Sequence, residues 1–222
     1  MRSTPQQKVG SIPTRRAQIV KWQFVPVAVA GLCLVLGLVL LAQGLWIPIK
    51  AQLAQILLAR AWAQTLQGHA APPWPGADTT AVAELSFADK SFVVLSGGSG
   101  QALAFAPSHL SGTPQPGAAG LSVIAGHRDT HFSSLGRLAP GQIVSLRLAD
   151  GSRHHFRITE GRIMDARTAR LNARGGPPRL ALVTCWPLDS PVPGGPLRFV
   201  LFANLIPISY QWRTNNKPPP YQ

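Results

Sequence analysis

The longest apolar stretch of the chain lies near its N-terminus. No charged residue occurs between Trp22 and Ile49, and Phe24 to Trp46 is almost wholly apolar. At about 1.5 Å per residue, a helix over this stretch would extend about 35 Å, which is enough to cross a bilayer. Tryptophan stands at both ends of the stretch, as interfacial anchors do. The pattern predicts a transmembrane helix over residues 23–47.

A cleaved signal peptide and a buried core helix are the two alternatives for this stretch. The apolar part of a signal peptide is about 7–15 residues long, which is shorter than the stretch seen here. An uncharged run of this length is also uncommon in the core of a soluble protein. We therefore expect an uncleaved signal anchor, within which Cys33 is a small apolar helix residue.

Charge is distributed unevenly on the two sides of the predicted helix. Five lysines and arginines and no acidic residue precede it, whereas all eight acidic residues follow it. The positive-inside rule then predicts a cytoplasmic N-terminus over residues 1–22 and places the rest of the chain outside the cytoplasmic membrane. The net charge of +13 raises the question of nucleic-acid binding. The arginines after the helix are scattered and accompany no nucleic-acid-binding motif, so we expect no nucleic-acid partner.

The segments on either side of the outer domain have their own patterns. Residues 48–79 are predicted to form a juxtamembrane helix, rich in helix formers, followed by a linker with prolines at 72, 73 and 75. Residues 207–222 end in Pro-Pro-Pro-Tyr-Gln and are predicted to form a flexible tail. Residues 80–206 remain as one domain.

Short β-type runs alternate with turn residues throughout this domain. The candidate strands are 81–87, 92–95, 102–105, 122–125, 143–148, 154–158, 180–184 and 197–204. Gly97-Gly-Ser-Gly100 and Ala149-Asp-Gly-Ser152 are predicted hairpin turns. Seven or eight short strands with few helices indicate an all-β domain that forms a closed or nearly closed barrel.

Cys185 is the only cysteine outside the predicted membrane helix. On the outer side of a membrane, thiols are usually paired in disulfides. An unpaired thiol there is either an inert core residue or a reactive one. Cys185 closes the apolar run Leu180–Val183, so we expect it at the end of a strand.

Two more polar residues occupy comparable positions. His127 follows the predicted strand ending at Ala125, and Arg198 lies in a predicted strand on the face opposite Leu197 and Phe199. Each residue alone has an ordinary explanation: His127 as a hydrogen-bonded structural histidine, and Arg198 as an exposed arginine on a half-solvated strand. Together with Cys185 they supply the nucleophile, the proton donor and the oxyanion partner that cysteine catalysis requires.

His127 and His131 are also four residues apart, which is a metal-ligand spacing on a helix. However, Arg128 stands where the zinc-protease motif has glutamate, and the segment is predicted to be a loop. We therefore predict no metal and no cofactor. Asp129 is expected either to cap a short helical turn or to orient His127.

At this point the chain resembles a known family. Ala125-Gly-His-Arg-Asp-Thr-His-Phe132, Leu182-Val-Thr-Cys-Trp-Pro187 and Pro193-Gly-Gly-Pro-Leu-Arg-Phe199 are similar to the motifs of the sortases, and most similar to those of the Gram-negative class GN, or marine, sortases. The resemblance extends from about residue 81 to residue 204, and the N-terminal anchor is typical of the family. Ala181 departs from the pattern, since many sortases have threonine there.

The resemblance implies an eight-stranded sortase β-barrel with short helices and a membrane-anchored cysteine transpeptidase that faces the periplasm. Cys185 would attack a backbone carbonyl of a C-terminal sorting signal and form a thioester. His127 would protonate the departing amine and deprotonate the amine acceptor. Arg198 would hold the oxyanion, helped by a backbone N–H such as that of Trp186.

The resemblance also suggests substrate contacts near the cysteine. Thr184 is expected to pack or hydrogen-bond beside it, and Trp186 either lines the substrate groove or covers the barrel end. The segment 161–179 carries five arginines and would shape the groove. Two other functions stay open: a cysteine hydrolase acting on peptides, and a non-catalytic β-barrel that only binds peptide.

Overall fold

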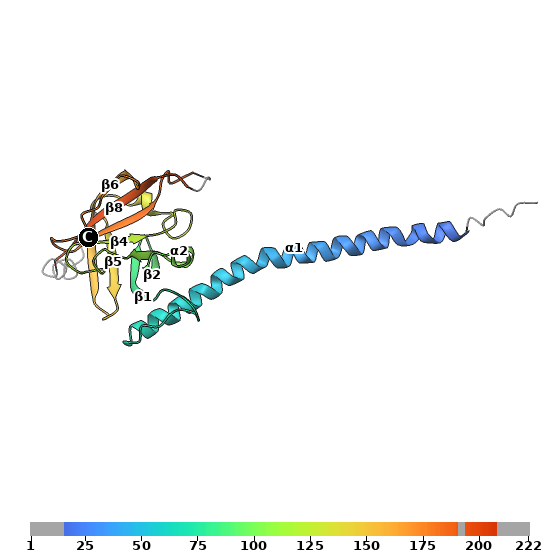
Figure 1. Ribbon diagram of the computed structural model, residues 1–222, viewed down its shortest axis with the longest axis horizontal. Helices are drawn as coiled ribbons and strands as arrows, with labels where there is room; N and C mark the ends of the chain where they lie inside the picture. The colour runs from blue at the N-terminus through green and yellow to red at the C-terminus, as the bar shows by residue number, and fades with distance from the viewer. Residues whose placement is uncertain (1–15, 191–193, 208–222) are drawn as a thin grey trace, which may run out of the picture. The chain divides into compact units, whose positions relative to one another are not determined.

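The computed structural model describes residues 16–190 and 194–207. Residues 1–15 of the predicted cytoplasmic segment, and all but the first residue of the predicted tail, lie outside this range. The chain divides after Lys50 into two compact units. Figure 1 shows one long helix in the first part of the chain and a small β-barrel in the remainder.

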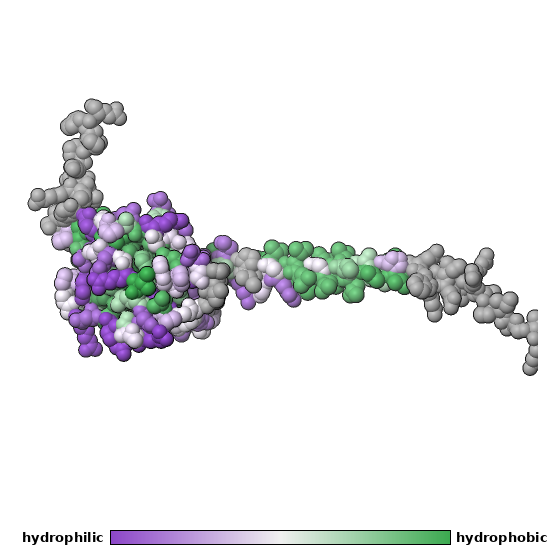
Figure 2. Space-filling view, turned by 90° about the horizontal axis from the view of Figure 1, so that it is seen from above, coloured by the Kyte–Doolittle hydropathy of each residue, from purple (hydrophilic) through white to green (hydrophobic). Residues whose placement is uncertain are grey.

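Helix α1 (Arg16–Thr65) joins the two helices expected from the sequence without a break. By length and composition it contains one segment, within Val25–Thr65, that could cross a membrane. The side chains described between residues 25 and 46 are almost all exposed, and Figure 2 shows this surface as strongly apolar. An exposed apolar surface of this length is what lipid would cover.

The last turns of α1 belong to the second unit. Ala54, Leu58, Ala61 and Trp62 are buried, and their spacing places them on one face of the helix. Leu58 packs with Leu95 in a cluster that also includes two buried alanines, Ala102 and Ala106, and the half-buried rings of Trp74 and Phe105. The Pro-rich segment after the helix thus contributes Trp74 to the packing. The Trp74 ring meets the Phe105 ring edge-on, with the ring centroids 5.0 Å apart.

Eight strands form a closed barrel in the order β1-β2-β3-β4-β7-β8-β6-β5, as the sequence predicted. The strands are β1 (Ala81–Phe87), β2 (Lys90–Gly97), β3 (Ser108–Leu110), β4 (Leu121–Ala125), β5 (Ile143–Leu148), β6 (Arg153–Asp165), β7 (Arg179–Cys185) and β8 (Leu197–Leu205). β1 shows the alternation expected of a barrel strand, with every second residue buried. The interior is filled by aliphatic side chains and by the rings of Phe87, Phe132 and Phe156.

Two predictions about the connection after β2 are wrong. Residues 102–105 form part of a short helix, α2 (Gly100–Phe105), whose Ser99 side chain accepts a hydrogen bond from the Ala102 backbone. Gly97–Gly100 is not a hairpin turn, because β2 and the unpredicted strand β3 are parallel and need a crossover. Gln-Ala-Leu-Ala consists of good helix formers, and the serine cap decides in favour of a helix.

Strand β6 is longer than predicted. It continues from the expected 154–158 region to Asp165 and pairs with β8 up to the Asp165–Leu197 pair. The first part of the arginine-rich segment 161–179 is therefore strand and only residues 166–178 form a connection. Asp165 starts that connection, since its carboxylate accepts hydrogen bonds from the backbone and side chain of Arg167 at 2.6–3.1 Å.

Truncation of Leu58 tests how much the packing of this side chain contributes to stability. Leu58→Ala should lower the free energy of unfolding by about 2–5 kcal/mol, because it leaves a cavity in a closed cluster. Ile56→Ala on the same helix is the control, since Ile56 is 52% exposed and should change it by less than about 0.5 kcal/mol. Denaturant unfolding of the detergent-solubilised chain measures both. Equal effects of the two substitutions would contradict the packing described.

Asp165 should make stability depend on pH in the acid range. Its hydrogen bonds with Arg167 lower its pKa from 3.8 to about 2. Because the folded state favours the ionised carboxylate, the stabilisation is complete above pH 4 or so and is lost as pH falls towards 2. The melting temperature of the wild type should therefore fall more steeply over this interval than that of Asp165→Asn. Asp78→Asn, at an exposed position, should keep the wild-type slope.

Candidate active site

Strand pairing brings the three predicted catalytic residues together at one end of the barrel. β4 and β7 run parallel, with Ala125 opposite Val183, so the residues that follow β4 lie beside the end of β7. β8 runs antiparallel to β7, and its register places Arg198 directly opposite Cys185. Directly opposed residues on one face have their Cβ atoms about 4.5–5.5 Å apart. His127, Cys185 and Arg198 thus meet from three strands.

These residues line one open cavity of about 170 Å³. Its remaining walls come from α2, β4 and β7: Leu103, Ala125, Gly126, Val183 and Thr184. His127 is exposed, and Cys185 and Arg198 are half-buried. All three are therefore accessible to a polypeptide that enters the cavity. The sequence did not indicate Leu103, because residues 102–105 read as a strand.

Gly126 connects the histidine segment to the cysteine strand. Its N–H donates to Val183 O at 3.0 Å, and its carbonyl accepts from the Thr184 hydroxyl at 2.8 Å. A Cβ at this position would lie 2.9 Å from the buried ring of Phe132, so only glycine permits this approach. Thr184 thus hydrogen-bonds beside the cysteine, as expected, and is itself buried.

Arg198 is held by the chain that precedes it. Its Nη1 donates to Gly195 O at 2.7 Å and to Leu197 O at 2.8 Å. These two bonds use one nitrogen of a group that carries five N–H donors in a fixed fork. The guanidinium is therefore oriented before any substrate arrives, and its charge persists at every working pH.

Trp186 differs from one expectation. Its backbone N–H donates to Leu197 O at 3.1 Å, because pairing with β8 continues one residue beyond β7, and this N–H is engaged with the barrel rather than presented to an oxyanion. Its ring is tilted against Phe199, with the ring centroids 6.1 Å apart. Trp186 is not among the residues that line the cavity.

The segment after His127 arranges its polar residues in pairs. Arg128 Nε donates to Asp129 Oδ1 at 2.7 Å, and this bond lowers the pKa of Asp129. The carboxylate thus pairs with its neighbour, and an electrostatic interaction with His127 lowers its pKa further. The N-cap position of the following 3-10 turn is occupied by Ser134 rather than by Asp129. His131 is half-buried against the Phe92 ring, and burial lowers its pKa. Across residues 16–190 and 194–207, no group of three or more histidine, cysteine or acidic side chains could hold a metal.

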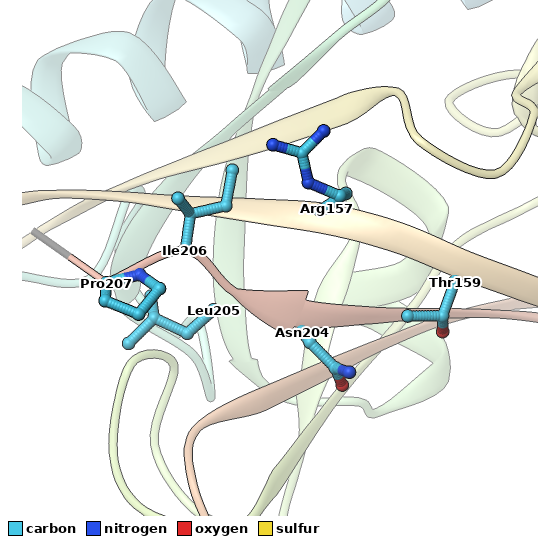
Figure 3. Close-up of a pocket in the computed structure, with 6 residues that line it drawn as sticks. All are labelled: Arg157, Thr159, Asn204, Leu205, Ile206 and Pro207. Carbon is cyan, nitrogen blue, oxygen red and sulfur yellow. The ribbon is translucent and has the colours of Figure 1, made fainter. Parts of the chain in front are cut away.

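A second cavity, of about 320 Å³, opens on another part of the barrel. Figure 3 shows its lining side chains, which come from β6 and from the end of β8: Arg157, Thr159, Asn204, Leu205, Ile206 and Pro207. Asn204 is opposite Arg179, the first residue of β7, whereas Cys185 is the last. The larger cavity therefore lies at the other end of the β7–β8 pair from the predicted catalytic residues and contains none of them.

Solved structures with the same fold are sortases. Sortase A from Corynebacterium diphtheriae is 20% identical, with a TM-score of 0.51 over 60% of this chain and 64% of that chain. A pilus-related sortase C of Group B Streptococcus is 20% identical, with a TM-score of 0.51 over 58% of this chain and 69% of that one. A Clostridium perfringens sortase D5 transpeptidase is 17% identical, with a TM-score of 0.58 over 70% of this chain and 99% of that one. The chain thus spans just under two thirds of the first of these structures.

The sequence comparisons give one match at the level of the family. No curated protein sequence matches the chain. The sortase domain model matches residues 85–206, which is more than half of the chain and includes β2 to β8 with His127, Cys185 and Arg198. The chain belongs to the sortase family.

Proposed function

We propose that this protein is a membrane-anchored sortase that cleaves a C-terminal sorting signal through a thioester and transfers the acyl group to an amine. The observation that carries the proposal is the meeting of Cys185, His127 and Arg198 around one open cavity. A thiol, an imidazole and an oriented guanidinium are the groups that acyl transfer by cysteine requires. Their accessibility suits a polypeptide substrate.

The first half of the reaction forms the acyl-enzyme. The Cys185 thiolate attacks the scissile carbonyl carbon, and the negative charge moves to the carbonyl oxygen. Arg198, already oriented by Gly195 and Leu197, stabilises that oxyanion. The oxyanion then collapses, the C–N bond breaks, and His127 protonates the departing amine. A thioester to Cys185 and the released C-terminal fragment remain.

The second half reverses the order of these events with a different amine. The acceptor amine attacks the thioester carbonyl, His127 removes its proton, and Arg198 again stabilises the oxyanion. Cys185 leaves as a thiolate, and a new amide bond is formed. Exposure of His127 to solvent suits this role, because both the leaving and the entering amine must reach it.

Thr184 and Trp186 are proposed to act at the substrate side of this site. The Thr184 side chain forms part of the cavity wall while its hydroxyl holds Gly126. The half-buried Trp186 ring follows Cys185 directly and lies against Phe199, where a bound peptide would pass the barrel end. The connection 166–178, between β6 and β7, is proposed to border the groove, with its arginines facing either solvent or substrate carboxylates.

We also propose a class and a cellular location for the enzyme. The motifs around His127, Cys185 and Arg198 resemble class GN sortases of Gram-negative bacteria. The apolar part of α1, preceded by five basic residues, supports a single-pass anchor in the inner membrane with the barrel in the periplasm. The expected partner is a protein with a short C-terminal motif, an apolar helix and a basic tail.

The first experiment tests the three residues together. Full-length protein in detergent is incubated with a protein that carries such a C-terminal tail, with and without an added amine, and products are identified by mass spectrometry. Cys185→Ala should form no product, and His127→Ala and Arg198→Ala should reduce kcat/KM by about 10²–10⁴-fold and 10²–10³-fold. Cys33→Ala, His69→Ala and Arg153→Ala change the same residue types away from the cavity and should remain active.

Two outcomes would assign a different function. Cleavage without any amine-linked product would make the protein a cysteine hydrolase. Tail binding with no cleavage by the wild type, and unaltered cellular function of Cys185→Ala, would make it a non-catalytic binding module. Either result would contradict the transpeptidase proposal.

The Thr184 hydroxyl should matter both for stability and for turnover. Thr184→Val keeps the shape of the side chain but leaves the Gly126 carbonyl without its donor, so it should lower the free energy of unfolding by about 1–3 kcal/mol and also lower kcat. Thr184→Ser keeps the hydroxyl and should retain most of kcat. Chemical denaturation and steady-state kinetics measure the two effects. If the valine variant turned over like the wild type, the hydrogen bond to Gly126 would have no part in organising the site.

A further inference from the structure

Arg128 is unusual among the basic residues of this chain. Its side chain is 4% exposed, and among the residues whose burial the structure describes it is the only buried lysine or arginine. By contrast, the arginines in the other ion pairs, Arg162 and Arg167, are 59% and 73% exposed. Burying a guanidinium is costly unless its donors are satisfied, so the contacts that hold it there are informative.

Those contacts join two loops that are distant in sequence. Arg128 Nη1 donates to Pro187 O at 2.8 Å, and its Nε donates to Asp129 Oδ1 at 2.7 Å. Arg128 directly follows His127, and Pro187 is two residues after Cys185. One buried side chain therefore fastens the loop that carries the histidine to the loop that leaves the cysteine.

A second set of contacts lies on the other side of His127. Gly126, which precedes the histidine, is bonded to Val183 through its N–H and to Thr184 through its carbonyl. His127 is thus held between contacts to residues 183, 184 and 187, which flank Cys185 on both sides. The contacts before the histidine involve uncharged groups, whereas the contact after it depends on the Arg128 guanidinium.

The guanidinium keeps its charge in this buried position. The pKa of Arg128 is raised, first by the hydrogen bond to Asp129. Its N–H donors therefore stay available to Asp129 and to Pro187 at every working pH.

We infer that Arg128 is a positioning residue: its buried guanidinium, bonded to Asp129 and to Pro187, holds the loop of His127 against the loop that leaves Cys185. The inference rests on the proposed function, since it assigns a further role within the same reaction. Arg128 faces the Pro187 carbonyl and the Asp129 carboxylate, so it acts through its neighbours and does not contact the reacting carbonyl. A merely structural role would lower stability but leave the kcat of a folded variant unchanged.

The test uses full-length protein in detergent with Cys33→Ala in every variant, so that Cys185 is the only thiol. Arg128→Met removes the guanidinium and all of its donors, whereas Arg128→Lys keeps a charged donor group but not the planar fork. Arg137→Met is the matched control, because Arg137 is exposed and lies in the same segment, in the 3-10 turn Leu135–Arg137. For each variant we would measure thermal unfolding, the rate of Cys185 alkylation by iodoacetamide at neutral pH, and kcat and KM for the tailed substrate.

Arg128→Met should lower kcat by about 10- to 100-fold with KM changed less than about twofold, as expected when a catalytic pair is misplaced. The alkylation of Cys185 at neutral pH should be slower than that of the wild type, because a displaced His127 no longer accepts the thiol proton. Arg128→Lys should restore little of kcat, because an ammonium lacks the fixed fork that joins Pro187 to Asp129. Arg137→Met should match the wild type in every measurement.

Three results would overturn the inference. One is a folded Arg128→Met with wild-type kcat and a wild-type alkylation rate. Another is loss of kcat to the same extent in Arg137→Met. If Arg128→Met does not fold, Arg128→Lys provides the test. Full kcat in that variant would show that the planar guanidinium is not required for positioning. Alkylation needs no substrate, so an inactive wild type would count against the proposed function, whereas an active wild type with indifferent Arg128 variants would count only against this inference.

Discussion

Strand β7 pairs in parallel with β4 on one side and antiparallel with β8 on the other, and the rest of the site depends on this arrangement. Parallel pairing places the loop after β4, with His127, beside the end of β7. Antiparallel pairing sets Arg198 opposite Cys185. A slip of one residue in either ladder would turn the side chains of that strand to the other face of the sheet. The buried interior of the barrel opposes such a slip, because Leu180 and Leu182 must remain inside.

Hydrogen bonds from the histidine loop fix the position of the histidine further, in addition to the strand pairing. Gly126 is bonded to Val183 and Thr184, and Arg128 reaches Pro187. The close approach of the Phe132 ring excludes a side chain at Gly126, and Phe132 is at the same time a core residue. The loop that bears the histidine is thus fixed to the barrel interior on one side and to the cysteine strand on the other. Preorganisation of this kind lets a site stabilise charge without rearranging during the reaction.

The sequence predicted much of this molecule because its strongest signals are local. A long uncharged stretch, short β-type runs and the Asp150-Gly151 turn need only the neighbouring residues to be recognised, and they correctly indicated an apolar helix and a closed barrel. The errors fall where local signals compete. Residues 102–105 form a short apolar run that was predicted to be a strand, yet the Ser99 cap and the parallel β2–β3 pair make them helical. The extension of β6 to Asp165 likewise depends on β8, a partner more than thirty residues away.

By itself the sequence indicated the candidate residues for chemistry: the one cysteine outside the apolar helix, a histidine and an arginine, each at the end of or within an apolar run. Only the tertiary structure decided how they are supported. It placed Leu103 in the cavity wall, engaged the Trp186 N–H with Leu197, and buried Arg128 between two loops that lie 59 residues apart along the chain. Such contacts join segments distant in sequence, and their geometry follows from strand register and close packing, which no local pattern of residues encodes.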